Sequence, residues 1–99
     1  MKYYTLVGSF NENHPLGEEL QQIINDHHIF LNTGFKNGTV LVSGPKVGAK
    51  GGIMLVKCDD IQQFCNEDPL VKAGIQNYQI SEFKLYDCQD FVKGWFEEM

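Results

Sequence analysis

Residues 27–45 have the sequence HHIFLNTGFKNGTVLVSGP, which contains the helix end, the turn and the strand that decide the fold. The first half continues an amphipathic helix, and we expect that helix to run from about Pro15 to Lys36. Proline suits the first turn of a helix because its missing N–H has no helical partner there. Asn37-Gly38 is typical of a helix stop. The apolar run Thr39–Ser43 then predicts a short strand.

One titratable residue lies in the middle of the apolar face of this helix. The apolar positions have the i, i+3, i+4, i+7 spacing of a helix packed on a core; they are Leu16, Leu20, Ile23, Ile24, His27, Leu31 and Phe35. At 100° per residue they cover an arc of about 100–120°, with His27 near its centre. His27 is either a core-edge residue whose ring nitrogens bind backbone or water, or a general acid/base.

Further strands and helices complete the pattern. We predict strands at Lys2–Gly8, Ile53–Cys58 and Ile75–Tyr86, the last with a bulge near Ser81-Glu82, and helices that begin at Asp59-Asp60, at Asp68-Pro69 and near Asp87. The order β-α-β-β-α-β, followed by a C-terminal helix, predicts a ferredoxin-like α+β fold. In that fold an antiparallel four-stranded sheet carries both long helices on one face.

The composition limits the classes of function. The chain has 99 residues, enough for a single domain over residues 1–99. Its net charge of -5 and the lack of a basic stripe argue against a nucleic acid as partner. No apolar run approaches the ~20 residues of a membrane span, and the first residues resemble a strand, not a signal peptide. Cys58, Cys65 and Cys88 form no CxxC pair, so we expect reduced thiols and a cytoplasmic location.

The strands predict that the protein pairs with itself. Lys2–Gly8 and Ile53–Cys58 carry apolar residues at both alternating sets of positions. Because helices cover only one face of the predicted sheet, roughly several hundred Å² of apolar surface would remain exposed, which monomers rarely tolerate. We therefore expect a homodimer formed through the open sheet face.

Asp68 and Ser43 are further candidates for a site. Asp68 precedes Pro69 and is explained as a helix cap. It also lies on the inward side of the second helix, where its carboxylate can meet His27, fix the imidazole tautomer and raise its basicity. Ser43 is either a turn residue or a ligand contact.

Metal and cofactor sites are not indicated. His14 and His28 have no partner at ligand spacing, and a zinc site needs three or four ligands. The glycines of residues 44–52 match neither the phosphate-binding loop nor the dinucleotide pattern. We therefore expect no metal ion and no cofactor.

The order of these residues resembles the YCII-related family. The matching pieces are His27, Leu31, Gly38, the segment Ser43-Gly44-Pro45, and the segment EDPLVKAG at Glu67–Gly74. The resemblance implies a ferredoxin-like fold of the dimeric α/β-barrel group. It also implies a pocket centred on a histidine and an aspartate, here His27 and Asp68, with Ser43, Gly44 and Pro45 contacting the substrate. Most members have no assigned reaction; relatives include a dehydrochlorinase that acts on a chlorinated hydroxyhydroquinone, and the wider fold group includes muconolactone isomerases.

Two positions depart from the family pattern. Ile24 stands where many members have an arginine one turn before the histidine, which removes a clamp for an anionic substrate. Leu70 stands where an aromatic residue is frequent. Three functions remain open: a small cofactor-free enzyme in which His27 moves a proton on a small cyclic or aromatic molecule, a non-catalytic small-molecule-binding or accessory module, and a purely structural dimeric unit.

Overall fold

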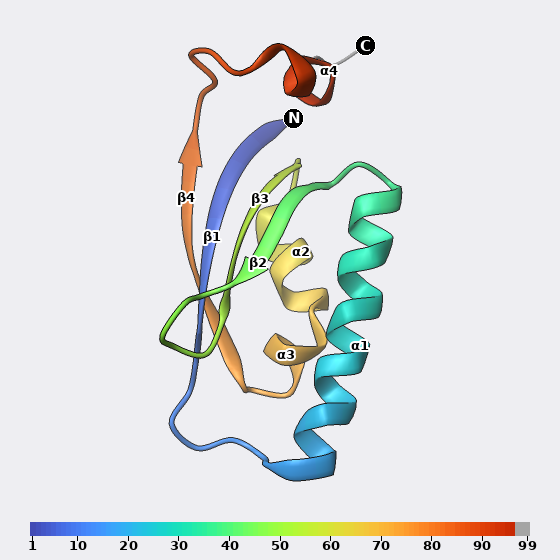
Figure 1. Cartoon of the computed structure of the whole chain (residues 1–99), viewed down its shortest axis with the longest axis vertical. Helices are drawn as coiled ribbons and strands as arrows, with labels where there is room; N and C mark the ends of the chain where they lie inside the picture. The colour runs from blue at the N-terminus through green and yellow to red at the C-terminus, as the bar shows by residue number, and fades with distance from the viewer. Residues whose placement is uncertain (97–99) are drawn as a thin grey trace.

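An antiparallel four-stranded sheet carries the three main helices on one of its faces (Figure 1). The strands are β1 (Lys2–Phe10), β2 (Val40–Pro45), β3 (Gly52–Cys58) and β4 (Gln76–Phe83), in the spatial order β2-β3-β1-β4. The helices are α1 (Gly17–Lys36), α2 (Ile61–Glu67), α3 (Pro69–Lys72) and α4 (Lys93–Phe96), with a 3₁₀ turn η1 (Asp90–Val92) before α4. This computed structural model describes residues 1–96 and confirms the predicted ferredoxin-like α+β fold.

The core lies between the sheet and the helices α1 and α2. Every second residue of β1 faces it, so that Tyr4 and Leu6 are buried. Met54 and Val56 do the same from β3. This two-residue period is what a strand with one covered face requires. Further core members are Val40 and Cys65, with Leu31, Ile61 and Phe64 packed against them.

The predicted helix ends are confirmed at three places. The side chain of Asp60 accepts a hydrogen bond from the Gln63 backbone N–H at 3.0 Å and caps α2. Asp68 caps α3, with Pro69 at the first helical position. Helix α1 ends at Lys36 with Asn37 as its C-cap, and Gly38 follows with φ 82, in the left-handed region that favours glycine.

Helix α1 begins at Gly17, two residues after the start predicted near Pro15. Leu16 has an extended backbone, with φ -126 and ψ 172, and Gly17 has φ 63. The ring of His14 binds the Pro15 carbonyl at 2.7 Å, just before the helix. Leu16 is consequently 71% exposed and does not belong to the apolar face.

The fourth strand is shorter and more regular than predicted. It pairs with β1 without interruption from Tyr3–Phe83 to Phe10–Gln76, so the expected bulge near Ser81-Glu82 is absent from it. Phe83 lies on the opposite face from Tyr78 simply because residues alternate along a strand. The register shift occurs instead in β2, between Val40 and Val42.

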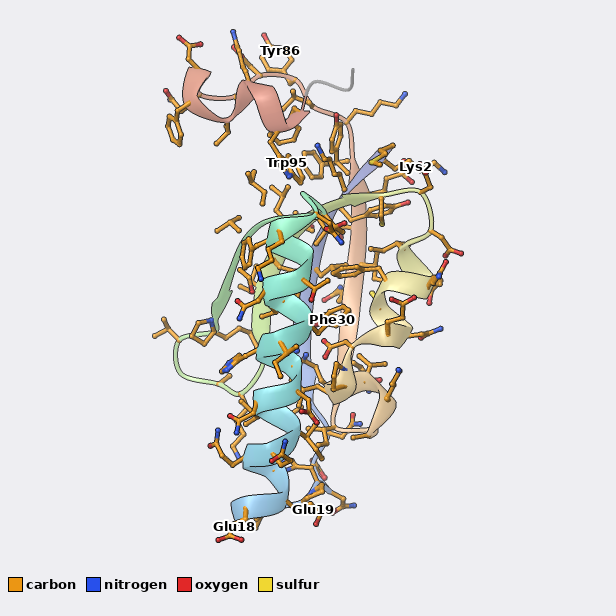
Figure 2. All side chains as sticks on the ribbon, turned by 90° about the vertical axis from the view of Figure 1, so that its right-hand side faces the viewer. Lys2, Glu18, Glu19, Phe30, Tyr86 and Trp95 are labelled. Carbon is orange, nitrogen blue, oxygen red and sulfur yellow. The ribbon has the colours of Figure 1, made fainter. Side chains whose placement is uncertain are left out.

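The C-terminal segment lies over one end of the sheet. The Trp95 indole N–H donates to the Gly38 carbonyl at 2.8 Å, and Lys57 lies 4.8 Å from the centre of the Trp95 ring. The Tyr3 hydroxyl donates to the Phe96 carbonyl. Figure 2 places Trp95 beside the start of β1 near Lys2, at the opposite end of the molecule from the first turn of α1.

The second sheet face carries apolar side chains away from α1, α2 and α3. Val42 is 55% and Ile53 49% exposed there, and Val7 and Leu55 are half-buried. The strand register places all four on the same face. Across residues 1–96, no helix has the length and apolar character needed to cross a membrane.

Candidate functional site

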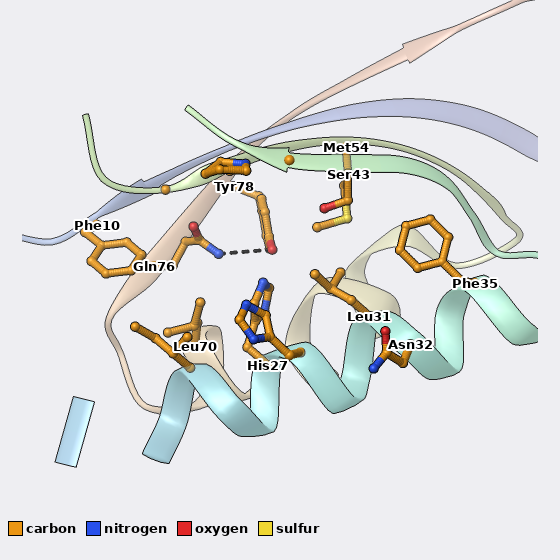
Figure 3. Close-up of a pocket in the computed structure, with 16 residues that line it drawn as sticks. Phe10, His27, Leu31, Asn32, Phe35, Ser43, Met54, Leu70, Gln76 and Tyr78 are labelled. Atoms are coloured by element: carbon orange, nitrogen blue, oxygen red, sulfur yellow. Dashed lines mark hydrogen bonds between the residues drawn. The ribbon is translucent and has the colours of Figure 1, made fainter. Parts of the chain in front are cut away.

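A cavity of about 350 Å³ lies between α1 and the ends of all four strands (Figure 3). Cavities that bind small molecules usually measure roughly 300–1,000 Å³. The apolar side chains of its wall are Phe10, Ile24, Leu31, Phe35, Met54 and Leu70, and the polar ones are His27, His28, Asn32, Ser43, Gln76 and Tyr78. Gly44 and Pro45 also line it, so the whole Ser43-Gly44-Pro45 segment borders the cavity.

His27 and Asp68 meet beside this cavity. The Nδ1 atom of His27, in the middle of α1, lies 2.7 Å from Oδ1 of Asp68, the residue between α2 and α3. The Asp68 side chain is fully buried, and the His27 side chain is 13% exposed. Helix α1 and the junction of α2 with α3 thus bring together the imidazole and the carboxylate that the sequence predicted to meet.

Both oxygens of the Asp68 carboxylate accept further hydrogen bonds. The Leu70 backbone N–H donates to Oδ1 at 3.0 Å, and the Tyr78 hydroxyl donates to Oδ2 at 2.6 Å. An ionised carboxylate has acceptors only, so the His27 nitrogen that faces it carries the proton. In the neutral imidazole with this tautomer, the second ring nitrogen, Nε2, is the one that can accept a proton.

Tyr78 and Gln76 belong to the site, although the sequence did not single them out. The Gln76 side-chain N–H donates to the Tyr78 hydroxyl oxygen at 3.0 Å, and Figure 3 shows that hydroxyl directed toward the His27 ring. Burial raises the pKa of Tyr78, and the adjacent Asp68 charge and hydrogen bond raise it further. The phenol is therefore a hydrogen-bond donor throughout the neutral pH range. The sequence did offer one signal for this part of the site: Gln76 occupies an inward-facing strand position, and such positions are usually apolar.

The other histidines have different surroundings. His28 lines the cavity, and its ring centre lies 5.9 Å from that of His27. His14 binds the Pro15 carbonyl outside the cavity wall. Within residues 1–96, no group of three or more His, Cys, Asp or Glu side chains could hold a metal ion.

The sequence matches a known family over the part of the chain that contains this site. The family model of the YCII-related domain matches residues 1–84. No curated protein matches the chain. The family match includes α1, which carries His27, the α2–α3 junction at Asp68, and all four strands of the sheet. The chain therefore belongs to the YCII-related family.

Proposed function

We propose that the protein is a small enzyme in which His27 acts as a general acid/base on a small cyclic or aromatic molecule. The contact of 2.7 Å between His27 and the buried Asp68 carboxylate, at the wall of a cavity, is the observation that carries this proposal. A buried carboxylate fixes the imidazole tautomer and stabilises the imidazolium formed when the base takes a proton.

The proposed reaction is a proton transfer. Nε2 of His27 removes a proton from an acidic C–H or O–H of the substrate, and the imidazolium returns it to another carbon or to a leaving group. The result is an isomerisation or an elimination, and neither step needs a metal ion or a cofactor. Acid–base catalysis of this kind contributes about 10²- to 10⁴-fold to the rate.

The cavity wall supports an uncharged, flat substrate. Among the described residues that line it, none is Lys, Arg, Asp or Glu. Ile24 lies in the wall at the position where many family members have arginine, so an anionic group would find no ion-pair partner there. The Ser43 hydroxyl and the Asn32 amide remain as groups that can bind a carbonyl or hydroxyl of the substrate.

Proton exchange gives a direct test. The protein would be incubated in D₂O with a panel of unsaturated lactones and chlorinated hydroquinones, and deuterium uptake and product formation followed by mass spectrometry. We expect His27→Asn to lower the rate by about 10²-fold or more. His14→Gln, which changes a histidine outside the cavity, should retain it. A His27→Asn protein with full turnover would overturn the proposal, and a compound that stabilises the protein thermally but returns unchanged would favour a non-catalytic binding module.

We further propose that two copies pair through the open sheet face. Val42 and Ile53 are about half exposed on this face, beside the half-buried Val7 and Leu55. Apolar side chains gathered on one face are typical of a protein–protein contact. A second copy of the same face satisfies them symmetrically, as in most homodimers.

A reducing compartment suits this protein, and we propose the cytoplasm as its location. Cys58, Cys65 and Cys88 are all free thiols. Burial raises the pKa of both Cys58 and Cys65, and neighbouring negative charges raise it further, which keeps these thiols protonated and slow to oxidise.

A further inference from the structure

The Asp68 carboxylate is held from two sides. His27 binds Oδ1 at 2.7 Å, and the Tyr78 hydroxyl binds Oδ2 at 2.6 Å. The two partners come from different layers of the fold, since His27 is on α1 and Tyr78 is on β4. Each donor that binds a carboxylate takes up part of its negative charge, so Tyr78 and His27 compete for the same charge.

Gln76 sets the direction of the Tyr78 hydroxyl. Its side-chain N–H donates to the Tyr78 oxygen at 3.0 Å, and the Gln76 residue is only 2% exposed. A phenol has a single proton to donate. Because the Gln76 contact uses a lone pair of that oxygen, the proton of Tyr78 is directed to Asp68.

Gly8 provides the space that this arrangement needs. It lies opposite Tyr78 in the register between β1 and β4. A Cβ atom at Gly8 would lie 2.5 Å from Oε1 of Gln76 and 3.0 Å from Cε1 of Tyr78. Any larger residue would therefore displace the Gln76 amide from the Tyr78 hydroxyl.

We propose that Gly8, Gln76 and Tyr78 form a positioning unit for Asp68, a role that rests on the acid–base function proposed for His27. The Tyr78 hydroxyl weakens the attraction between Asp68 and the His27 ring proton. The unit holds Asp68 where it binds Nδ1 of His27, which leaves Nε2 as the ring nitrogen available as a base. Tyr78 and Gln76 act through Asp68, so they are positioning residues and not the base itself.

The ring titration of His27 tests the unit without any substrate. The midpoint would be measured by NMR from the ring C–H signal in the wild type and in Tyr78→Phe. Loss of a hydrogen bond to a charged group should raise the midpoint by about one pH unit. The groups that face His27 are Asp68, Tyr78 and the ring of His28, with Cys65 near Asp68, and all but Tyr78 are unchanged in this variant.

Tyr3→Phe is the matched control. It also removes a tyrosine hydroxyl hydrogen bond, the one to the Phe96 carbonyl, but on the other face of the sheet. Tyr3→Phe should lower stability and leave the His27 midpoint in place. A folded Tyr78→Phe protein whose His27 midpoint equals that of the wild type would overturn the positioning unit.

Two further variants keep the test decisive if Tyr78→Phe fails to fold. Gln76→Leu and Gly8→Ala both break the same hydrogen bond between Gln76 and Tyr78, so they should raise the His27 midpoint by similar, smaller amounts. Unchanged midpoints in both would also overturn the unit. The proposed function is tested separately. The turnover of His27→Asn shows whether His27 is the base, whereas the NMR titration shows whether Tyr78 acts on His27 through Asp68.

Discussion

His27 and Leu70 donate to the same atom, Oδ1 of Asp68, from 2.7 Å and 3.0 Å respectively. One carboxylate oxygen therefore both caps α3 and binds the imidazole. The interpretation of Asp68 as a helix cap and its interpretation as the partner of His27 are both correct. Capping fixes the carboxylate on the backbone of α3. The fixed carboxylate then fixes the ring of His27, so local helix chemistry positions the candidate base.

The shared oxygen makes Asp68 far more important for stability than an ordinary cap. Asp68→Ala would leave a buried N–H, a buried hydroxyl and the His27 ring without their acceptor, and we expect the free energy of unfolding to fall by about 3–5 kcal/mol. Asp60→Ala removes an exposed cap and should cost about 1 kcal/mol. Urea unfolding of both variants checks this. Equal losses would show that Asp68 contributes as a cap alone.

Local signals made most of the fold predictable. Asp60, Asp68-Pro69 and Asn37-Gly38 mark helix ends through bonds to residues two or three positions away, and all three are confirmed. The errors lie where the partner is distant. Strand β1 continues to Phe10, past its predicted end, because Ser9 and Phe10 pair with β4.

The same distinction explains what was predicted of the site. His27 lies at a periodic inward position of α1, and Asp68 continues the inward side of α2 as the cap that follows it, so their meeting followed from two local patterns. Tyr78, Gln76 and Gly8 belong together only through the register of β1 with β4. Cross-strand register depends on pairing between segments that are almost 70 residues apart, and one sequence contains no local signal for it.

Gly34 should resist substitution although it lies within a helix. Alanine favours a helix over glycine by about 1 kcal/mol. A Cβ atom at Gly34, however, would lie 2.6 Å from Cγ2 of Val40, and overpacking of this kind costs about 1–3 kcal/mol. We expect Gly34→Ala to lower the free energy of unfolding in the wild type. In a Val40→Ala background the clash is gone, and Gly34→Ala should become stabilising. If Gly34→Ala lowered the free energy of unfolding equally in both backgrounds, the contact with Val40 would be refuted.

Cys65 predicts a loss of stability at alkaline pH. Burial, followed by the nearby Cys58 and Asp68, raises the pKa of Cys65 from 9.0 to about 11. The native state thus holds its proton after the unfolded chain has released it. The resulting stabilisation is complete below about pH 9 and is lost as the pH rises toward about 11. Urea unfolding across this range should show a shallower decline for Cys65→Ala than for the wild type or Cys88→Ala, and identical slopes would contradict the assignment.

The open sheet face predicts the oligomeric state. In a two-fold symmetric dimer, a substitution in the interface occurs twice, once in each copy. A lysine at position 53 would therefore lie near the same lysine of the other copy or be buried without an ion-pair partner. We expect light scattering after size exclusion to give twice the chain mass of 11.3 kDa for the wild type at micromolar concentration, and the single mass for Ile53→Lys. Ile29→Lys is the matched control, because Ile29 is 63% exposed on α1, away from this face. A wild-type protein that is only monomeric would refute the dimer. A dimer that survives Ile53→Lys but not Ile29→Lys would place the dimer contact on α1 instead of the open sheet face.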